Sequence, residues 1–373
     1  MTMASPELSP PADGAPPPVA TSRVAARARL EEALLPSVVA LLVAAIVGDA
    51  LIVTFGQAPA AVFRLLLDGT WGNSYGFGQV LYKATTLTFT GLSIAFALRA
   101  GLFNIGAESQ LAAGGFVAAV VGLSLPPGLP WIVMLPVYVA AAALGGGVVG
   151  GIAGELKSRF GAHEVITTIM LNFIVLALLS YLTSTYLKVP ETLHTTEIRS
   201  GAVPRLANFF EAFHGSAANL VLVVAALSCA IAWWYLFRTR RGFELRAVGL
   251  QPDAAEYAGV RPGAVWTRAM AISGAIAGLG GLNFVLGYKH YYEEGFAGGS
   301  GFLGIAVALV GGTHPLGVAL AALLFATISQ GGLAVNALVP KQFVEVLQAV
   351  VIIAVAVSVP EVRRLLRVRR RTE

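Results

Sequence analysis

The chain has 373 residues, of which 56% are hydrophobic and only 12% are charged, and its formal net charge is +5. A soluble domain usually carries about 25% charged residues, so this composition excludes an ordinary soluble protein. The arginines lie at the edges of long apolar runs without an aromatic-basic surface, which argues against nucleic-acid binding.

The N-terminal segment is rich in proline and alanine, and we expect residues 1–30 to form a disordered, basic cytoplasmic terminus. Its basic patch of Arg23, Arg27 and Arg29 precedes an apolar run at about 34–55. This run is too long for the apolar region of a signal peptide. We therefore interpret 34–55 as an uncleaved first membrane helix.

Further apolar runs predict an all-α, polytopic helical membrane protein with eight to ten transmembrane helices. A helix needs about 20 apolar residues to cross a bilayer. The run 301–312 is short for a full span, so a re-entrant half-helix is the alternative there. The expected helices after the first are 79–98, 102–123, 130–154, 164–187, 218–237, 267–287, 301–312, 315–331 and 342–360.

The positions of arginine and lysine predict the orientation of these helices, because cytoplasmic loops of membrane proteins carry an excess of both residues. Arginines cluster in 238–268 and in 361–373, and Lys157 and Arg159 lie in one short loop. We expect these segments and both termini to be cytoplasmic, with 31–360 as the membrane domain. The loops 56–78, 188–217 and 288–300 are then outside.

Glycines recur every four residues in two of the predicted helices, at Gly146, Gly150 and Gly154 and again at Gly274 and Gly278. Small residues at this spacing allow helix backbones to approach closely in lipid. The pattern predicts tight helix packing rather than a binding site.

Polar side chains stand within the apolar stretch GLFNIGAESQLAAGG, namely Asn104, Glu108 and Gln110. Asn104 and Glu108 are four residues apart, so we expect them on one helix face, with Gln110 pointing elsewhere. A carboxylate at bilayer depth is costly unless it faces protein or a water-filled path. Asn172 and Asn283 are two further amides deep in apolar runs.

Two interpretations of these five side chains stay open. They could line a hydrophilic route for a small polar solute, or they could join helices through hydrogen bonds worth about 0.6–2 kcal/mol each. Arg99 likewise has two interpretations: its side chain extends to the cytoplasmic interface, or it pairs with Glu108.

The segment from Arg238 to Arg268 is too polar to cross a membrane. Pro252 can begin a helix, and the following residues DAAEYAGV predict a short amphipathic turn or two. Such a helix either docks into a groove on a partner or is a plain connection between two spans. The candidate docking residues are Gly249, Asp253, Ala254, Ala255, Tyr257, Ala258 and Gly259.

The sequence predicts neither an enzyme nor a metal site. A phosphate-binding loop is absent, since none of the five lysines follows a glycine, and HEVIT at 163–167 lacks the second histidine of a zinc-protease motif. We expect no cofactor in this chain, so that a partner subunit would have to bind any ATP used. The single Cys229 excludes an intrachain disulfide.

Four segments, in this order, resemble the permease subunits of bacterial ABC importers, and the nucleoside and simple-sugar branch of the branched-chain amino acid/sugar permease family in particular. The resemblance covers residues 80–358. Ser109 departs from the family pattern, which usually has glycine after the glutamate. The segments are GLFNIGAESQ (101–110), HEVITTIMLNFI (163–174), RAVGLQPDAAEYAGV (246–260) and GFLGIAVALVGGTHPLGVALAALLF (301–325).

The resemblance implies a multi-pass protein of the bacterial plasma (inner) membrane that imports a nucleoside or a simple sugar. It implies three kinds of partner: a cytoplasmic ATP-binding cassette subunit, a second homologous permease subunit, and an extracytoplasmic substrate-binding lipoprotein. Residues 246–260 would be the coupling loop that docks into the ATPase. A branched-chain amino acid permease and a secondary transporter remain the alternatives, although a secondary transporter has no need of a docking loop.

Overall fold

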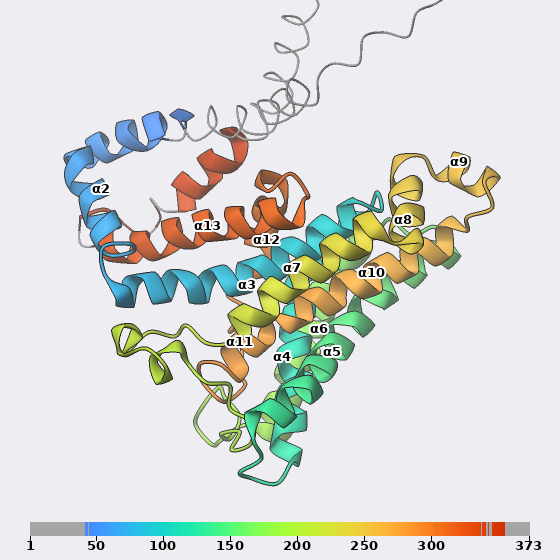
Figure 1. The fold of residues 1–373 in the computed structure, drawn as a ribbon, viewed down its shortest axis with the longest axis horizontal. Coiled ribbons are helices and arrows are strands. Elements are labelled where there is room, and N and C mark those ends of the chain that lie inside the picture. Colours follow the sequence, from blue (N-terminus) through green and yellow to red (C-terminus); the bar gives the residue numbers. More distant parts are fainter. Residues whose placement is uncertain (1–41, 44, 337, 341, 343–344, 355–373) are drawn as a thin grey trace, which may run out of the picture.

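The computed structural model describes residues 42–43, 45–336, 338–340, 342 and 345–354, and within these ranges it contains helices and no β-strand (Figure 1). The basic N-terminal patch, the tail 361–373, the first part of the span 34–55 and the last part of 342–360 lie outside the described residues. The helices are α2 (Pro59–Asp68), α3 (Ser74–Leu98), α4 (Ala107–Ser124), α5 (Trp131–Phe160), α6 (Glu164–Leu182), α7 (Val221–Arg238), α8 (Arg240–Leu250), α9 (Pro252–Tyr257), α10 (Pro262–Leu279), α11 (Gly281–Val285), α12 (Ser300–Val310) and α13 (Pro315–Val335).

Seven helices of the described part are long and apolar enough to cross a membrane. An eighth span is possible if the pair Ala45–Thr54 and Pro59–Asp68, bent by 112°, counts as one. Two shorter apolar helices, Ser300–Val310 and Glu345–Ala354, complete this part of the chain. The polytopic helical fold is thus confirmed, and the run 301–312 forms a helix of only 11 residues.

Several predicted helix boundaries differ from the structure. The expectation that Lys157 and Arg159 lie in a loop was wrong, because α5 continues to Phe160 and holds both residues in its last turn. α3 begins at Ser74 because the Asn73 side chain caps it, accepting a hydrogen bond from the Gly76 N–H at 2.6 Å. α10 begins at Pro262, since proline suits the first turn of a helix. α4 begins only at Ala107, and residues 101–106 before it are not helical.

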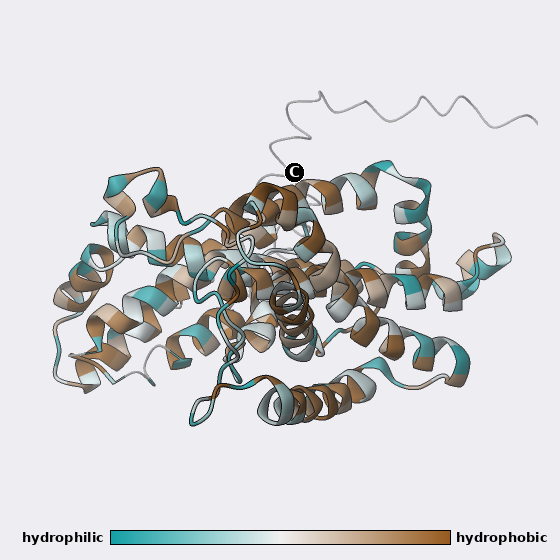
Figure 2. Ribbon diagram, turned by 90° about the horizontal axis from the view of Figure 1, so that it is seen from below, coloured by the Kyte–Doolittle hydropathy of each residue, from teal (hydrophilic) through white to brown (hydrophobic). Residues whose placement is uncertain are grey.

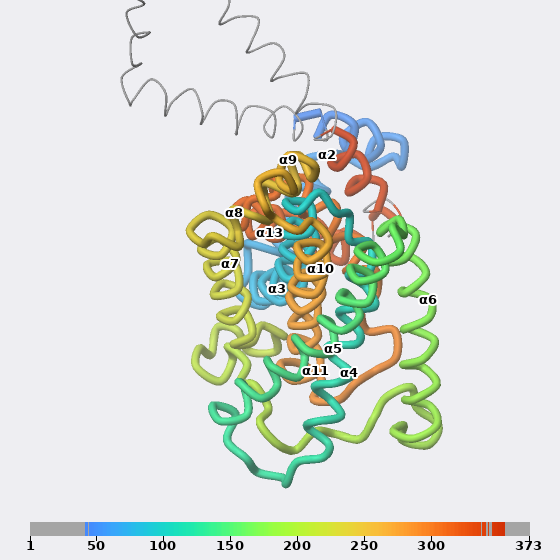
Figure 3. The backbone as a smooth tube through the Cα atoms, turned by 90° about the vertical axis from the view of Figure 1, so that its right-hand side faces the viewer, coloured from blue at the N-terminus to red at the C-terminus, as the bar shows by residue number. Residues whose placement is uncertain are grey.

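α5 and α10 form the most extensive helix–helix contact of the described residues, and Figure 3 shows them side by side. The predicted glycines make this contact. A Cβ atom on Gly146 would collide with the carbonyl oxygen of Gly274, and one on Gly278 would collide with that of Ala142. The tight packing predicted from the glycine spacing is therefore confirmed.

The outward faces of several helices are apolar. α6 lies at the edge of the bundle (Figure 3), and Phe173 and Ile174 on it are exposed, as are Leu227 and Ile231 on α7. Figure 2 shows brown, apolar residues along the helices and teal, polar residues mainly at their ends and in loops. Such faces suit lipid or a neighbouring subunit.

The two ends of the bundle differ in structure. At one end α8 and α9 lie together, and we call it the α8–α9 end (upper right in Figure 1). At the other end the connections 188–220 and 286–299 pack on each other, and we call it the loop end. An antiparallel β-bridge between His194 and Glu293 and a hydrogen bond from the Val203 N–H to the Leu286 carbonyl join the two connections.

Candidate translocation site and coupling surface

A non-helical segment separates α3 from α4, and a buried polar cluster surrounds this break in helical structure. The Asn104 amide nitrogen donates to the Gln110 side-chain oxygen and to Ser273 Oγ, both at 2.8 Å. Ser273 Oγ lies 2.9 Å from Ser93 Oγ. Two expectations were wrong: Asn104 precedes the helix instead of sharing a face with Glu108, and Gln110 points toward Asn104.

Asn172 joins α6 to the same break. Its amide nitrogen donates to the Ile105 carbonyl oxygen at 2.9 Å, and its oxygen accepts the Ser109 N–H at 3.1 Å. The Ser109 hydroxyl donates to the Gly106 carbonyl at 3.1 Å. Non-helical backbone within a membrane requires such partners, because lipid offers none.

Glu108 connects α4 to the short helix α12. Its two carboxylate oxygens accept the N–H groups of Gly299 at 2.8 Å and Gly301 at 2.6 Å. These groups belong to the first turn of α12, where a helix has unpaired N–H groups and a positive dipole end. The carboxylate thereby satisfies donors that would otherwise lack a hydrogen-bond partner in the protein, and its side chain is only 6% exposed.

Asn283 on α11 joins α3 to the start of α7. Its nitrogen donates to the Tyr82 carbonyl and to Thr86 Oγ1, both at 2.8 Å. Its oxygen accepts from the Asn219 amide nitrogen at 2.9 Å. Like the other four predicted pathway residues, Asn283 is buried and bonded to neighbouring elements.

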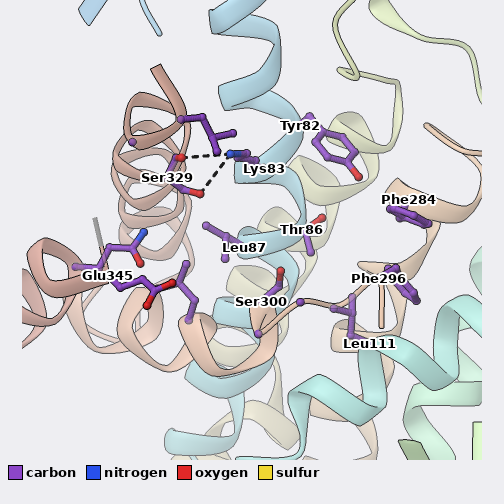
Figure 4. A pocket seen from close by; sticks show the side chains of 16 residues that line it. Tyr82, Lys83, Thr86, Leu87, Leu111, Phe284, Phe296, Ser300, Ser329 and Glu345 are labelled. Atoms are coloured by element: carbon purple, nitrogen blue, oxygen red, sulfur yellow. Dashed lines mark hydrogen bonds between the residues drawn. The ribbon is translucent and has the colours of Figure 1, made fainter. Parts of the chain in front are cut away.

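A cavity of about 500 Å³ lies beside these residues, between α3, α12, α13 and the helix Glu345–Ala354 (Figure 4). Its volume is in the range of ligand sites. Among the residues that line it, Tyr82, Lys83 and Phe296 combine aromatic rings with a cation. None of the five predicted pathway side chains lines it, so their place on a solute route stays a prediction.

This cavity was not predicted from the sequence, although one signal was present. Lys83 is the only charged residue of α3, a helix of 25 residues that is otherwise apolar or uncharged. Its ammonium nitrogen lies 3.3 Å from the Ser329 carbonyl oxygen and 3.4 Å from Ser329 Oγ. A lysine in an otherwise uncharged apolar helix is costly at bilayer depth and indicates a functional position.

Arg99 lies at the other end of α12, not beside Glu108. Its Nε donates to the Thr313 carbonyl oxygen at 3.0 Å, just after α12, and its guanidinium stands 5.6 Å from the ring centre of Phe237. α12 thus has a carboxylate at its N-terminus and a cation beyond its C-terminus. Both charges interact favourably with the helix dipole, the carboxylate with its positive end and the cation with its negative end.

The predicted docking segment forms two short helices, α8 and α9, at the α8–α9 end. Tyr257 is 95% exposed and Leu250 is 85% exposed, whereas Ala255 is buried at 5%. Ala255 therefore packs on the membrane domain and does not belong to an outward face. Gly249 is packed so closely on the carbonyl oxygen of Arg99 that a Cβ atom would collide with it.

Gly249 and Gly259 flank α9, and Gly259 has a φ of +83° where α9 ends. The other candidate docking residues are exposed: Asp253, Ala254, Ala258 and Gly259.

Among the described residues, no group of three or more His, Cys, Asp or Glu side chains could hold a metal ion.

Comparison with known proteins gives the family. Residues 76–356 match the model of a family described as the branched-chain amino acid transport system / permease component. The chain belongs to this permease family. No solved structure gives a significant match.

Three relatives of this permease cover most of its length. It is 36% identical to the guanosine ABC transporter permease protein NupP of Bacillus subtilis, over 88% of this chain and 94% of the relative. It is 32% identical to the nucleoside ABC transporter permease protein NupB of Lactococcus lactis, over 87% and 91%. It is 31% identical to the glucose ABC transporter permease protein TsgB13 of Haloferax volcanii, over 86% of each chain.

Proposed function

We propose that this permease is the membrane-spanning subunit of an ATP-driven importer and forms the passage for a nucleoside. The names of the relatives NupP and NupB support a nucleoside, and that of TsgB13 makes a simple sugar the second candidate. A separate ATPase subunit docks on α8 and α9, a second permease subunit completes the passage, and an extracytoplasmic lipoprotein delivers the solute.

The exposed face of α8 and α9 carries this proposal. Leu250 and Tyr257 are large apolar side chains that are almost fully exposed at an end of the bundle rich in arginine. That end faces the cytoplasm under the positive-inside rule, so these side chains would stand in water. Exposed apolar side chains rimmed by polar residues are typical of protein–protein contact sites, and a short helix seated in a groove is a common form of such contact.

A continuous set of contacts links this face to the cavity. Gly249 packs on the turn after α3, at Arg99, and Arg99 is bonded to Thr313 beyond the C-terminus of α12. At the other end of α12, its cap residue Gly299 and its first residue Ser300 line the cavity. A displacement of α8 and α9 by the ATPase would therefore reach α12 and change the wall of the cavity.

In this mechanism Glu108 holds the N-terminus of α12, which lines the cavity, against α4. The polar cluster of Asn104, Gln110 and Asn172 keeps the break between α3 and α4 rigid, so that the turn at Arg99 and α4 move together. We retain these residues, with Asn283, as candidates for contact with the solute in other states of the transport cycle.

The proposal is tested by replacing Tyr257 with aspartate in cells that carry no other copy of this gene. Uptake of tritiated guanosine should fall to background while the amount of the permease in the membrane is unchanged, because a charge disrupts the apolar docking face. Tyr257→Phe, which keeps the ring, should transport normally. Normal uptake by Tyr257→Asp would contradict ATPase docking and would favour a secondary transporter.

A further inference from the structure

One wall of the 500 Å³ cavity is aromatic. Tyr82 on α3, Phe284 on α11 and Phe296 before α12 all line it (Figure 4). The rings of Phe284 and Phe296 are stacked with their centres 4.9 Å apart, and the ring of Tyr82 lies 5.3 Å from that of Tyr288. Because each ring is supported by another, this wall is formed in advance of any ligand.

The opposite side of the cavity is polar. Lys83 is directed toward α13, where Ser329 accepts from its ammonium group (Figure 4). Glu345 and Gln348 reach the same cavity from the helix Glu345–Ala354. One cation and one carboxylate give these walls a formal charge of zero, and together the polar groups offer both donors and acceptors for hydrogen bonds.

The floor of the cavity includes the start of α12. Gly298 and Gly299 have φ angles of +53° and +82°, a left-handed conformation that glycine adopts without strain. The N-terminus of a helix is a common phosphate site, but here Glu108 already occupies the N–H groups of Gly299 and Gly301. The carboxylate would also repel an anion, so the cavity does not suit a phosphorylated solute.

We propose that this cavity is the binding site for the solute within the membrane, and that its ligand is an unphosphorylated nucleoside. The base lies against the aromatic wall of Tyr82, Phe284 and Phe296. Every nucleobase has a flat π-face that stacks on aromatic side chains. The sugar hydroxyls bond to the polar groups around Lys83. This inference rests on the proposed function and deepens it by naming the residues and the ligand.

Two other ligands would use the cavity differently. A branched-chain amino acid would place its charged groups near Lys83 and Glu345 and would leave the aromatic wall without a planar partner. A free sugar would use the polar side but has no base. The competition pattern of a bound probe therefore distinguishes the three ligands.

The test is photolabelling of the purified, intact transporter with 8-azidoguanosine, followed by mapping of the labelled peptides. The label should map to residues 82–87 or 284–300, and excess guanosine should prevent it while ribose and leucine do not. Phe296→Leu should lower the labelling roughly tenfold, and Lys83→Gln, on the opposite wall, roughly fivefold. Phe173→Leu is the matched control, because Phe173 is exposed on α6 and does not line this cavity. Phe296→Tyr, which keeps an aromatic ring, should retain the labelling.

Guanosine uptake by the same wild-type preparation separates the two proposals. If the wild type imports guanosine but the label maps elsewhere, or is unchanged in Phe296→Leu and Lys83→Gln, this inference is overturned and the proposed function stands. Protection by leucine or ribose as strong as that by guanosine overturns the nucleoside assignment of the cavity. If the wild type imports no guanosine, the proposed substrate itself is wrong.

Discussion

Glu108 shows how a buried charge is accommodated by the fold. Its carboxylate accepts hydrogen bonds from the backbone N–H groups of Gly299 and Gly301, which lie 191 and 193 residues further along the chain. These N–H groups would otherwise lack a hydrogen-bond partner in the protein, and the carboxylate would otherwise be a bare charge at bilayer depth. Each group therefore compensates for the cost of the other.

Replacement of Glu108 by leucine should destabilise the permease strongly. It leaves the buried N–H group of Gly301 unsatisfied, which costs about 1–3 kcal/mol, and it removes the partner of the half-buried Gly299 N–H group. Glu108→Gln keeps one carbonyl oxygen in place and should be destabilised less. Thermal unfolding of the purified protein in detergent measures the difference, and equal stability of the leucine variant and the wild type would refute this account of Glu108.

The sequence was sufficient to single out the buried polar residues but not their partners. Asn104, Glu108, Gln110, Asn172 and Asn283 stood out because each lies in an apolar run. Their partners are backbone groups and side chains of distant segments, and a single sequence contains no information about that proximity. The alternative of Arg99 pairing with Glu108 was plausible in sequence, but the structure places these two side chains at opposite ends of α12.

At the scale of elements, most helices were predictable because a long apolar run has few alternatives to a membrane helix. The short length of α12 was also visible in the sequence. α8 was not predicted, because a helical period is hard to recognise over eleven residues that include four charged side chains and two glycines. The cavity was not predictable either, since its walls come from α3, α11, α12, α13 and the helix Glu345–Ala354.

The contact between α5 and α10 leads to a prediction about glycine packing. Gly278→Val should destabilise the purified protein by about 1–3 kcal/mol or more, because overpacking displaces helices that have no free space. Gly151→Ala, on the same pair of helices, is the control, since its Cβ atom would make an ordinary contact of 3.6 Å with Ala271. Unfolding temperatures of the two variants check this, and similar values would show that the close approach is not required.

For the whole molecule, the arrangement of charges predicts which end faces the cytoplasm. A cysteine introduced in the connection 188–220 should be labelled from outside in intact cells, after Cys229 has been replaced by alanine. Leu193 is the suitable position, because it is 65% exposed, whereas Thr195 nearby is fully buried. A cysteine at Arg240, whose side chain is 93% exposed on α8, should react only after lysis. Labelling of Arg240→Cys in intact cells and of Leu193→Cys only after lysis would show that the predicted orientation is wrong.

The central claim is that ATP hydrolysis by a docked subunit drives a nucleoside through this permease. The most direct measurement is guanosine uptake into vesicles reconstituted with the transporter purified together with its partner subunits, with ATP on the side of α8 and α9. The account predicts uptake that requires ATP, is unaffected by ionophores, and is lost in Tyr257→Asp. Uptake that proceeds without ATP and collapses when an ion gradient is dissipated would contradict it.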